Sequence, residues 1–314
     1  MNTHFTTDPT KAATYVRDGK LAVFPTETVY GLGANALDQE AVAQIYQAKR
    51  RPSSNPLIVH LGSLSDILRV ISEVTAIAEK LMEVFFPGPL TLILPRHPSV
   101  PKIVSGGLDT VAIRMPALPI AREFLESART PVAAPSANIS GRPSATTWQS
   151  AAEDLNHRVH CILCGPPATV GLESTVVDCT ETAPTLLRPG AISMETLRTV
   201  IPEFSTDASK AFRSPGMRYH HYTPAAKIQI VSHPEEINPG NHTGYIGLEA
   251  PPSDIKFKKF LIPNHVEEYC HYLFEFFRDC DRLGITMIYC QEVAESRLGH
   301  ALMDRLIRAA KSSK

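Results

Sequence analysis

The residues of this sequence best suited to chemistry are cations, hydroxyls and amides gathered in a few short stretches. One stretch is Lys49-Arg50-Arg51-Pro52, at the end of a predicted helix. Because Pro52 disfavours the helical conformation at Arg51, the chain should uncoil there and let Lys49 and Arg51 turn towards one polyanion, such as a triphosphate. The alternative is structural, since cations at the carboxyl end of a helix also stabilise its dipole.

A second candidate is Arg114, the one cation in the apolar stretch VAIRMP. A guanidinium on a buried strand needs a carboxylate or phosphate partner, either within the chain or on a ligand. Buried arginine is rarely left unpaired, and of the two partners we expect the ligand.

Hydroxyl and amide groups follow a predicted strand at residues 132–134. The stretch PSANISGRPSATT, residues 135–147, contains three serines, two threonines and one asparagine. Such groups at a strand end can bind phosphate and sugar, and the alternative is a capped turn. Residues 173–175 add another hydroxyl pair, and residues 188–190 add a loop cation.

A glycine-containing stretch, PTETVYGLGANA, occupies residues 25–36. The pattern predicts a strand that leads into a glycine turn and then a helix, an arrangement that exposes backbone N–H groups to an anion. The stretch lacks the GK[ST] of a Walker loop and the third glycine of GxGxxG, and the alternative is a plain glycine turn.

Metal-binding and covalent chemistry have little support. Cys161 and Cys164 would face opposite sides of a strand, and with His157 and His160 they offer too few ligands to wrap a tetrahedral zinc. No nucleophile elbow, HExxH or EF-hand spacing occurs. What remains fits nucleotidyl or phosphoryl transfer, in which positioning and charge stabilisation do most of the catalysis.

Charge and composition exclude other classes of protein. Lysine plus arginine, 31 residues, nearly cancels aspartate plus glutamate, 32 residues, so broad binding to nucleic acid or acidic membranes is not expected. No apolar run is long enough to span a bilayer, and the start lacks a signal-peptide core. Six cysteines without an export signal are expected to be reduced thiols, and the expected location is the cytoplasm.

The elements that must position these groups alternate between strands and helices. Strands are predicted at residues 21–29, 56–61, 90–94, 111–115, 132–134 and 174–178. Helices are predicted after caps at Asp8 and Asp38, and another ends before Pro87. The interleaving predicts an α/β fold with a mixed sheet and flanking helices.

The 314 residues suggest about two domains. Regular patterning dissolves after residue 201 into small, polar and aromatic residues, so we expect a first domain at residues 1–202 and a linker at residues 203–226. In residues 227–314, predicted strands at 228–231, 245–248, 260–262 and 285–289 alternate with helices, one of them capped by Asn264. This alternation predicts a small α/β domain with a parallel sheet.

Several motifs, taken in order, resemble those of the YrdC-like domain. They are PTETVYGLG, the Lys49-x-Arg51 pair, NPLIVHL, FPGPLTLIL, VAIRMP, the Ser136-x-Asn138 pair, GLESTVVD and LLRPGAIS. With the tract SPGMRYHHYTPAA and a small C-terminal domain, the chain is similar to the two-domain form of the threonylcarbamoyl-AMP synthases. The resemblance covers essentially the whole chain and is weakest in the C-terminal domain.

The resemblance implies a YrdC-like mixed twisted sheet with a Rossmann-like parallel-sheet C-terminal domain. It implies a nucleotidyltransferase that makes L-threonylcarbamoyl-adenylate from L-threonine, bicarbonate and ATP, with Mg²⁺, and releases pyrophosphate. The product would pass to a separate transferase that modifies the adenosine beside the tRNA anticodon. Direct tRNA binding would be weak or absent, and no membrane partner is implied.

Site residues follow from the same resemblance. Lys49 and Arg51 would be catalytic. Threonine or its carbamate would be held by Thr28, His60, Arg114, Ala134 and Ser174. The nucleotide and its phosphates would be surrounded by Arg51, Asn55, Thr110, Ser136, Asn138, Ser144, Arg188 and Tyr222. Arg50 stands where the family often has a smaller residue, and no metal ligands are implied.

The linker, with Tyr219, His221 and Tyr222, could close over the opening as a lid, and the alternative is an inert spacer. Two rival functions remain open. A double-stranded-RNA or tRNA-binding module, a role also suggested for YrdC-like domains, would need a broad basic face. The related carbamoyl transfer of hydrogenase maturation would need an acylphosphatase domain and cysteine-rich zinc modules, which the sequence does not show.

Overall fold

The protein is described here by a computed structural model that covers residues 1–205, 214, 222–237, 240 and 242–312. Within these residues the first part of the chain forms the strands β1 (His4–Thr6), β2 (Ala22–Phe24), β3 (Gly31–Asn35), β4 (Ile58–His60), β5 (Leu90–Pro95), β6 (Thr110–Arg114), β7 (Val132–Ala134), β8 (Cys161–Leu163), β9 (Thr175–Asp178) and β10 (Thr185–Arg188). They pair into one mixed sheet in the order β1-β8-β2-β3-β7-β4-β6-β5-β9-β10. The predicted α/β fold with a mixed sheet is confirmed.

Helices pack on both faces of this sheet. They are α1 (Pro9–Arg17), α2 (Gln39–Lys49), α3 (Ala76–Phe85), α4 (Pro119–Ala128), α5 (Trp148–Leu155) and α6 (Met194–Arg198), with the short 3-10 helix η1 (Leu64–Arg69). Successive strand residues alternate between two cores, because side chains in a strand point to opposite faces. In β2, Val23 packs into the core that contains α2, α3 and α5, whereas Ala22 and Phe24 pack against α1 and α4.

The predicted helix starts are confirmed. The side chain of Asp8 accepts a hydrogen bond from the backbone N–H of Lys11 at 3.1 Å, and Asp38 caps α2 in the same way. At the other end, α2 stops at Lys49 because Arg50 adopts a left-handed conformation with φ of 52°. The chain therefore leaves the helix before Arg51, as the proline predicted.

The predicted glycine turn is wrong. Residues Gly31–Asn35 form strand β3, which pairs antiparallel with β2, so the glycines lie inside the sheet. A Cβ on Gly33 would lie 2.7 Å from a methyl carbon of Val132 and 3.1 Å from the ring of Phe24. Gly33 thus makes space for the large Phe24 ring on the neighbouring strand. It does not expose backbone N–H groups to an anion at the start of a helix.

The C-terminal part of the described chain forms a second sheet. Its strands are β11 (Lys227–Val231), β12 (Thr243–Ile246), β13 (Lys259–Leu261) and β14 (Met287–Gln291), all parallel in the order β11-β14-β12-β13. Its helices are α7 (Val266–Arg282), α8 (Leu298–Ser312) and the 3-10 helix η3 (Pro234–Glu236). The predicted parallel-sheet domain is confirmed, but α7 begins one residue later than predicted, with His265 in place of Asn264 as its cap.

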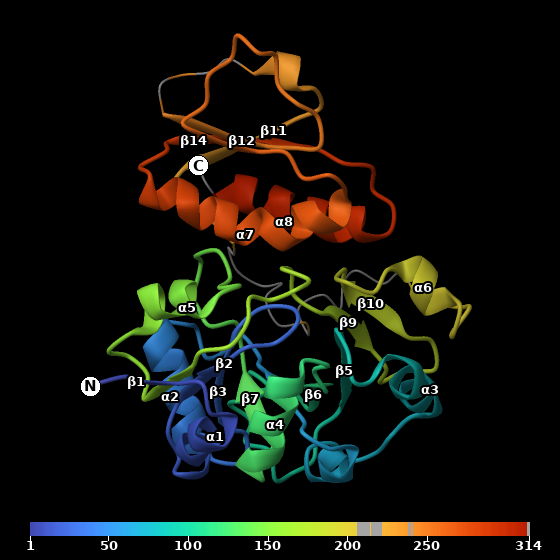
Figure 1. Ribbon diagram of the computed structural model, residues 1–314. Coiled ribbons are helices and arrows are strands. Elements are labelled where there is room, and N and C mark those ends of the chain that lie inside the picture. The colour runs from blue at the N-terminus through green and yellow to red at the C-terminus, as the bar shows by residue number, and fades with distance from the viewer. Residues whose placement is uncertain (206–213, 215–221, 238–239, 241, 313–314) are drawn as a thin grey trace.

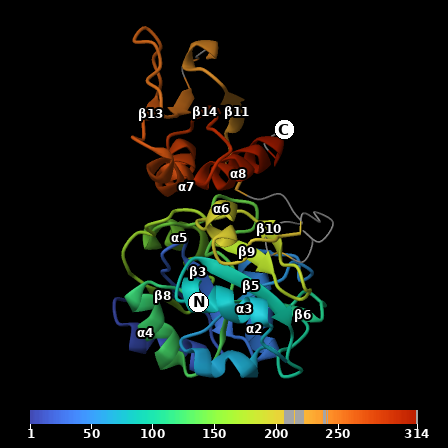
Figure 2. The same ribbon diagram turned by 90° about the vertical axis from the view of Figure 1, so that its right-hand side faces the viewer.

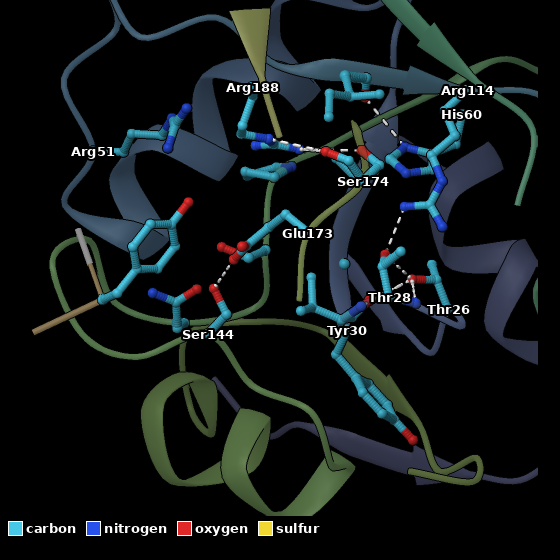
Figure 3. A pocket seen from close by; sticks show the side chains of 18 of the residues that line it. Thr26, Thr28, Tyr30, Arg51, His60, Arg114, Ser144, Glu173, Ser174 and Arg188 are labelled. Atoms are coloured by element: carbon cyan, nitrogen blue, oxygen red, sulfur yellow. Dashed lines mark hydrogen bonds between the residues drawn. The ribbon is translucent and has the colours of Figure 1, made fainter. Parts of the chain in front are cut away.

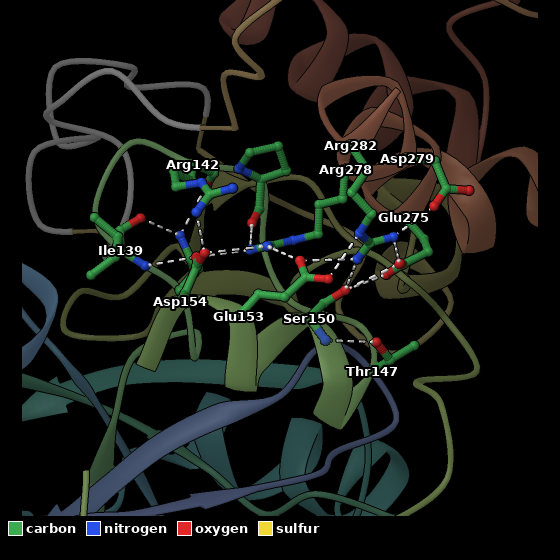
Figure 4. Close-up of polar contacts among 12 residues, drawn as sticks. Ile139, Arg142, Thr147, Ser150, Glu153, Asp154, Glu275, Arg278, Asp279 and Arg282 are labelled. Atoms are coloured by element: carbon green, nitrogen blue, oxygen red, sulfur yellow. Dashed lines mark hydrogen bonds and ion pairs between the residues drawn. The ribbon is translucent and has the colours of Figure 1, made fainter. Parts of the chain in front are cut away.

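Helices α7 and α8 lie between the small sheet and the first domain (Figure 1, Figure 2). Ion pairs join α7 to α5 across this interface (Figure 4). Arg278, at 1% exposure, lies 3.0 Å from a carboxylate oxygen of Asp154, and Arg282 lies 2.8 Å from Glu153. The interface therefore contains a buried ion pair, Arg278–Asp154, and a partly exposed pair, Arg282–Glu153.

Most of the predicted linker, including Tyr219 and His221, lies outside the described residues, so its boundaries and its role as a lid stay predictions. Tyr222, near its end, is described and is buried at 5% exposure. Across the described residues, no helix is both long enough and apolar enough to cross a membrane.

Candidate active site

A cavity opens where loops after the central strands of the mixed sheet meet the end of the linker (Figure 3). It holds about 650 Å³ of empty space, a volume that includes the open mouth of the cavity. The predicted site residues that line it are Thr28, Arg51, His60, Arg114, Ala134, Ser136, Asn138, Ser144, Ser174, Arg188 and Tyr222. The fold thus brings together side chains that are widely separated in the sequence.

Arg114 projects from β6 into this cavity and is buried at 3% exposure. Its Nη1 donates to the Thr28 hydroxyl at 2.6 Å, and its Nε donates to the carbonyl of Gly88 at 3.2 Å. Its Nη2 lies 2.7 Å from a carboxylate oxygen of Glu27, so part of the required partner is intramolecular. Nη2 is itself buried beside Glu27, so a ligand carboxylate would compete with Glu27 for the guanidinium.

His60 lies beside Arg114, on the parallel neighbour β4. Its Nδ1 is 3.2 Å from the carbonyl of Ile58, and because a carbonyl only accepts, Nδ1 carries the proton. Burial, and then the charge of Arg114, lowers the pKa of His60 to about 3. The imidazole is therefore neutral at physiological pH and is a polar wall of the cavity without charge.

Arg188, at the end of β10, holds the strand end at Ser174. Its Nε and Nη2 both donate to the Ser174 carbonyl, at 3.1 and 2.9 Å, and Nη2 also lies 3.1 Å from the Ser174 hydroxyl. That hydroxyl is 2.8 Å from the hydroxyl of Thr91. Arg188 and Ser174 line the cavity on the side opposite Ser144, while Thr91 lies buried behind Ser174 (Figure 3).

Lys49 and Arg51 diverge, although they were predicted to face the same ligand. Arg51 lines the cavity, where its Nη2 donates to the carbonyl of Pro56 at 2.9 Å. Lys49 is buried at 1% exposure, and its ammonium donates to the backbone carbonyls of Ser136 and Asn138. Burial holds the pKa of Lys49 well below its usual value. In this structure Lys49 supports the loop that carries Ser136, and it does not reach the cavity.

Asn55 and Thr110 are also absent from the described lining of the cavity. Asn55 is buried at 1% exposure, and its carbonyl accepts from Tyr46 and Arg51. Thr110 begins β6, at the opposite end of the strand from Arg114. Their predicted contacts with a nucleotide therefore require a ligand that extends beyond this cavity.

Glu173 and Arg142 line the cavity, and sequence reasoning assigned neither of them a role. Glu173 accepts a 2.5 Å hydrogen bond from the Ser144 hydroxyl. Arg142 pairs with Asp154, which also binds Arg278. Both residues lie within motifs that the sequence analysis identified. For Glu173, its position directly before the hydroxyl pair at residues 174–175 could have indicated a place in the site.

Tyr222 carries the end of the linker into the cavity wall. Its ring stacks on Phe274 with centroids 5.3 Å apart, and it adopts a left-handed backbone with φ of 69°. Burial raises the pKa of Tyr222 to about 12, so the phenol stays protonated at neutral pH. The C-terminal domain thereby holds one residue of the linker against the predicted nucleotide residues.

The described residues contain no group of three or more His, Cys, Asp or Glu side chains arranged to hold a metal ion. Cys161 and Cys164 are both free thiols. Glu173, which lines the cavity, already pairs with Arg305, and Glu27 pairs with Arg114. A metal ion at this site would therefore depend on oxygen ligands brought by the substrate.

An α/β sheet whose strand ends carry guanidinium, hydroxyl and amide groups around one cavity suits enzymes that move nucleotidyl or phosphoryl groups by positioning and charge stabilisation. Comparisons with known proteins narrow this class. The family model described as telomere recombination matches residues 14–190, and the model described as the threonylcarbamoyl-AMP synthase C-terminal domain matches residues 192–311.

Full-length relatives agree with these matches. The threonylcarbamoyl-AMP synthase of Pyrococcus abyssi is 44% identical, with 95% of this chain and 93% of the relative covered. That of Bacillus subtilis is 39% identical, with 97% and 94% covered. A crystal structure from Pyrococcus abyssi, complexed with L-threonine, has a TM-score of 0.88 at 40% identity and covers 97% of this chain and 94% of its own.

The chain belongs to the threonylcarbamoyl-AMP synthase family, in its two-domain form. It is an enzyme of the nucleotidyltransferase type.

Proposed function

We propose that the protein joins L-threonine, bicarbonate and ATP into L-threonylcarbamoyl-adenylate and releases pyrophosphate. The observation that carries the proposal is the pairing of two kinds of group in one cavity. Arg114 places a guanidinium at one part of the cavity, while Arg51, Arg188 and Ser144 supply cations and a hydroxyl at others. An amino acid and a phosphate chain could thus lie side by side, as the reaction requires.

Arg114 is the proposed partner of the threonine carboxylate. The Thr28 hydroxyl, the Gly88 carbonyl and the Glu27 carboxylate fix its guanidinium, so a substrate carboxylate would meet a cation that is already oriented. His60, which lies next to Arg114, is neutral and adds no second positive charge. It therefore does not repel the substrate amino group. The relative from Pyrococcus abyssi was crystallised with L-threonine, which supports threonine as a substrate.

Carbamate formation precedes transfer in this proposal. The neutral amine of threonine attacks the bicarbonate carbon, a C–N bond forms, and water leaves. The carbamate oxygen then attacks the α-phosphorus of ATP, an O–P bond forms, and the bond from that phosphorus to the bridging oxygen of the pyrophosphate breaks. Neither step needs a nucleophile from the protein, which matches a site composed of cations, hydroxyls and backbone groups.

Charge on the departing pyrophosphate is assigned to Arg51, with Arg188 and Ser144 along the rest of the nucleotide. Mg²⁺, carried by the ATP phosphates, would neutralise part of the same charge. Lys49 is given an indirect role, because its ammonium anchors the carbonyls of Ser136 and Asn138 beneath this part of the cavity.

The product is proposed to serve a separate transferase that modifies the adenosine beside the tRNA anticodon, and the cytoplasm is the proposed location. All six cysteines are free thiols, which suits a reducing compartment. Direct tRNA binding is expected to be weak because the net charge is −1. Measurement of tRNA affinity at several salt concentrations distinguishes this proposal from the rival RNA-binding function. An RNA-binding module would show a steep loss of affinity as the salt concentration rises.

The direct test is incubation of the purified protein with ATP, Mg²⁺, bicarbonate and threonine, with detection of the mixed anhydride by mass spectrometry. Omission of each component in turn is the control. The proposal expects product and pyrophosphate in equal amounts only when all components are present. Release of pyrophosphate that does not depend on threonine would overturn it.

A further inference from the structure

Arg305 is a fully buried cation of the C-terminal domain that the proposed chemistry does not use. It lies in α8 at 0% exposure, beneath the wall of the cavity. Its Nε donates to a carboxylate oxygen of Glu173 at 3.0 Å, and its Nη1 donates to the carbonyl of Pro189 at 2.9 Å. Its guanidinium carbon lies 5.6 Å from the ring centroid of Tyr222. One side chain thus contacts three separate segments of the first domain and linker.

Each of these segments carries a residue of the cavity. Glu173 receives the Ser144 hydroxyl on the carboxylate oxygen that Arg305 leaves open, at 2.5 Å. Pro189 directly follows Arg188, which holds Ser174. Tyr222 itself lines the cavity. The segments come from three distant parts of the sequence, and in the described structure Arg305 is a contact that they share.

We propose that Arg305 is a positioning residue for the nucleotide side of this cavity, a role that rests on the proposed function for the identity of the ligand. The guanidinium fixes the Glu173 carboxylate, the carboxylate orients the Ser144 hydroxyl, and the bond to Pro189 fixes the turn that presents Arg188. The C-terminal domain therefore orients residues of the active site through Arg305, which does not itself line the cavity.

Geometry explains why arginine occupies this position. A guanidinium offers donors in a rigid fork, so Nε and Nη1 can serve a carboxylate and a carbonyl in different directions at the same time. A lysine ammonium at residue 305 would preserve the charge and lose this fork. Arg305→Lys is therefore the sharper variant, because Arg305→Ala would also leave Glu173 as a buried carboxylate without its counter-charge.

The first experiment measures KM for ATP, KM for threonine and kcat in Arg305→Lys. The expected result is a rise in KM for ATP of about fivefold or more, the effect of one lost hydrogen bond, with KM for threonine changed less than about twofold. Arg282→Lys is the matched control, because Arg282 crosses the same interface to Glu153 and Ser150, neither of which lines the cavity (Figure 4). Its constants should stay within about twofold of the wild type.

The route through Glu173 is tested by Glu173→Gln and by the double variant. If Arg305 acts through the carboxylate, the KM effects of the two single changes should not add in the double variant. Thermal unfolding of every variant is followed in parallel. A lower melting temperature with KM for ATP unchanged would overturn the proposal and leave Arg305 a purely structural residue, as would full additivity.

Calorimetric titration with ATP and Mg²⁺ separates this proposal from the proposed function. If the wild type binds ATP but makes no adenylate, while Arg305→Lys binds ATP more weakly than Arg282→Lys, the proposed reaction fails and the positioning role stands. If the wild type makes the adenylate and both variants bind ATP equally well, the reaction stands and the positioning role fails.

Discussion

His60 allows a quantitative test of how completely this wall of the active site is shielded from water. The change is His60→Gln, which keeps a polar side chain and removes the titrating group. Burial lowers the pKa of His60 to about 3 in the folded protein, whereas histidine in an unfolded chain titrates at about 6.5. The unfolded state therefore binds more protons between these two values, so the stability present above pH ~6.5 is lost as the pH falls towards 3.

The size of the effect follows from the two pKa values. Between pH 7.5 and pH 5, protonation of the unfolded histidine lowers the free energy of unfolding by about 2 kcal/mol. The His60→Gln variant lacks the contribution of His60 to the pH dependence of the free energy of unfolding. All other titrating groups contribute equally to the variant and to the wild type. The wild type minus variant difference in the free energy of unfolding should thus decrease by about 2 kcal/mol over this range.

The assay is urea unfolding at a series of pH values, followed by tryptophan fluorescence. Trp148 is the single tryptophan of the chain and lies in α5, so the signal reports the domain that contains His60. A wild type minus variant difference that stays constant from pH 7.5 to pH 5 would refute the reasoning. It would mean that the folded imidazole accepts a proton as readily as the unfolded one.

Three further changes have distinct expected outcomes. Arg114→Lys should raise KM for threonine by roughly tenfold or more with KM for ATP little changed, because a single ammonium cannot replace the oriented fork, and equal changes in both constants would contradict this. Lys49→Met should raise KM for ATP by roughly tenfold, since two backbone carbonyls of the cavity loop lose their donor, while exposed Lys80→Met should have no effect. Gly33→Ala should lower the free energy of unfolding by about 1–3 kcal/mol, and a second change, Val132→Ala, should restore part of it; equal stability in all three proteins would show that the sheet is not tightly packed there.

Local signals were sufficient for much of the fold. The cap at Asp8, the helix end before Pro52 and the apolar strands near Arg114 depend on neighbours within a few residues, and all three were predicted correctly. The parallel C-terminal sheet also followed from alternating strands and helices. The glycine stretch failed because the same residues suit a turn and a tightly packed strand, and only the Phe24 ring on the next strand decides between them.

The sequence by itself determined which residue types are available and which short motifs carry them, because caps, strand patterns and motif order are local properties of the chain. Only the tertiary structure decided where those side chains point. In the folded chain Lys49 lies beneath a loop, whereas Arg51 lines the cavity. Arg305, on the last helix, contacts Glu173 and Pro189. Contacts between such distant segments depend on how the two sheets and their helices pack, and no spacing within a motif records that packing.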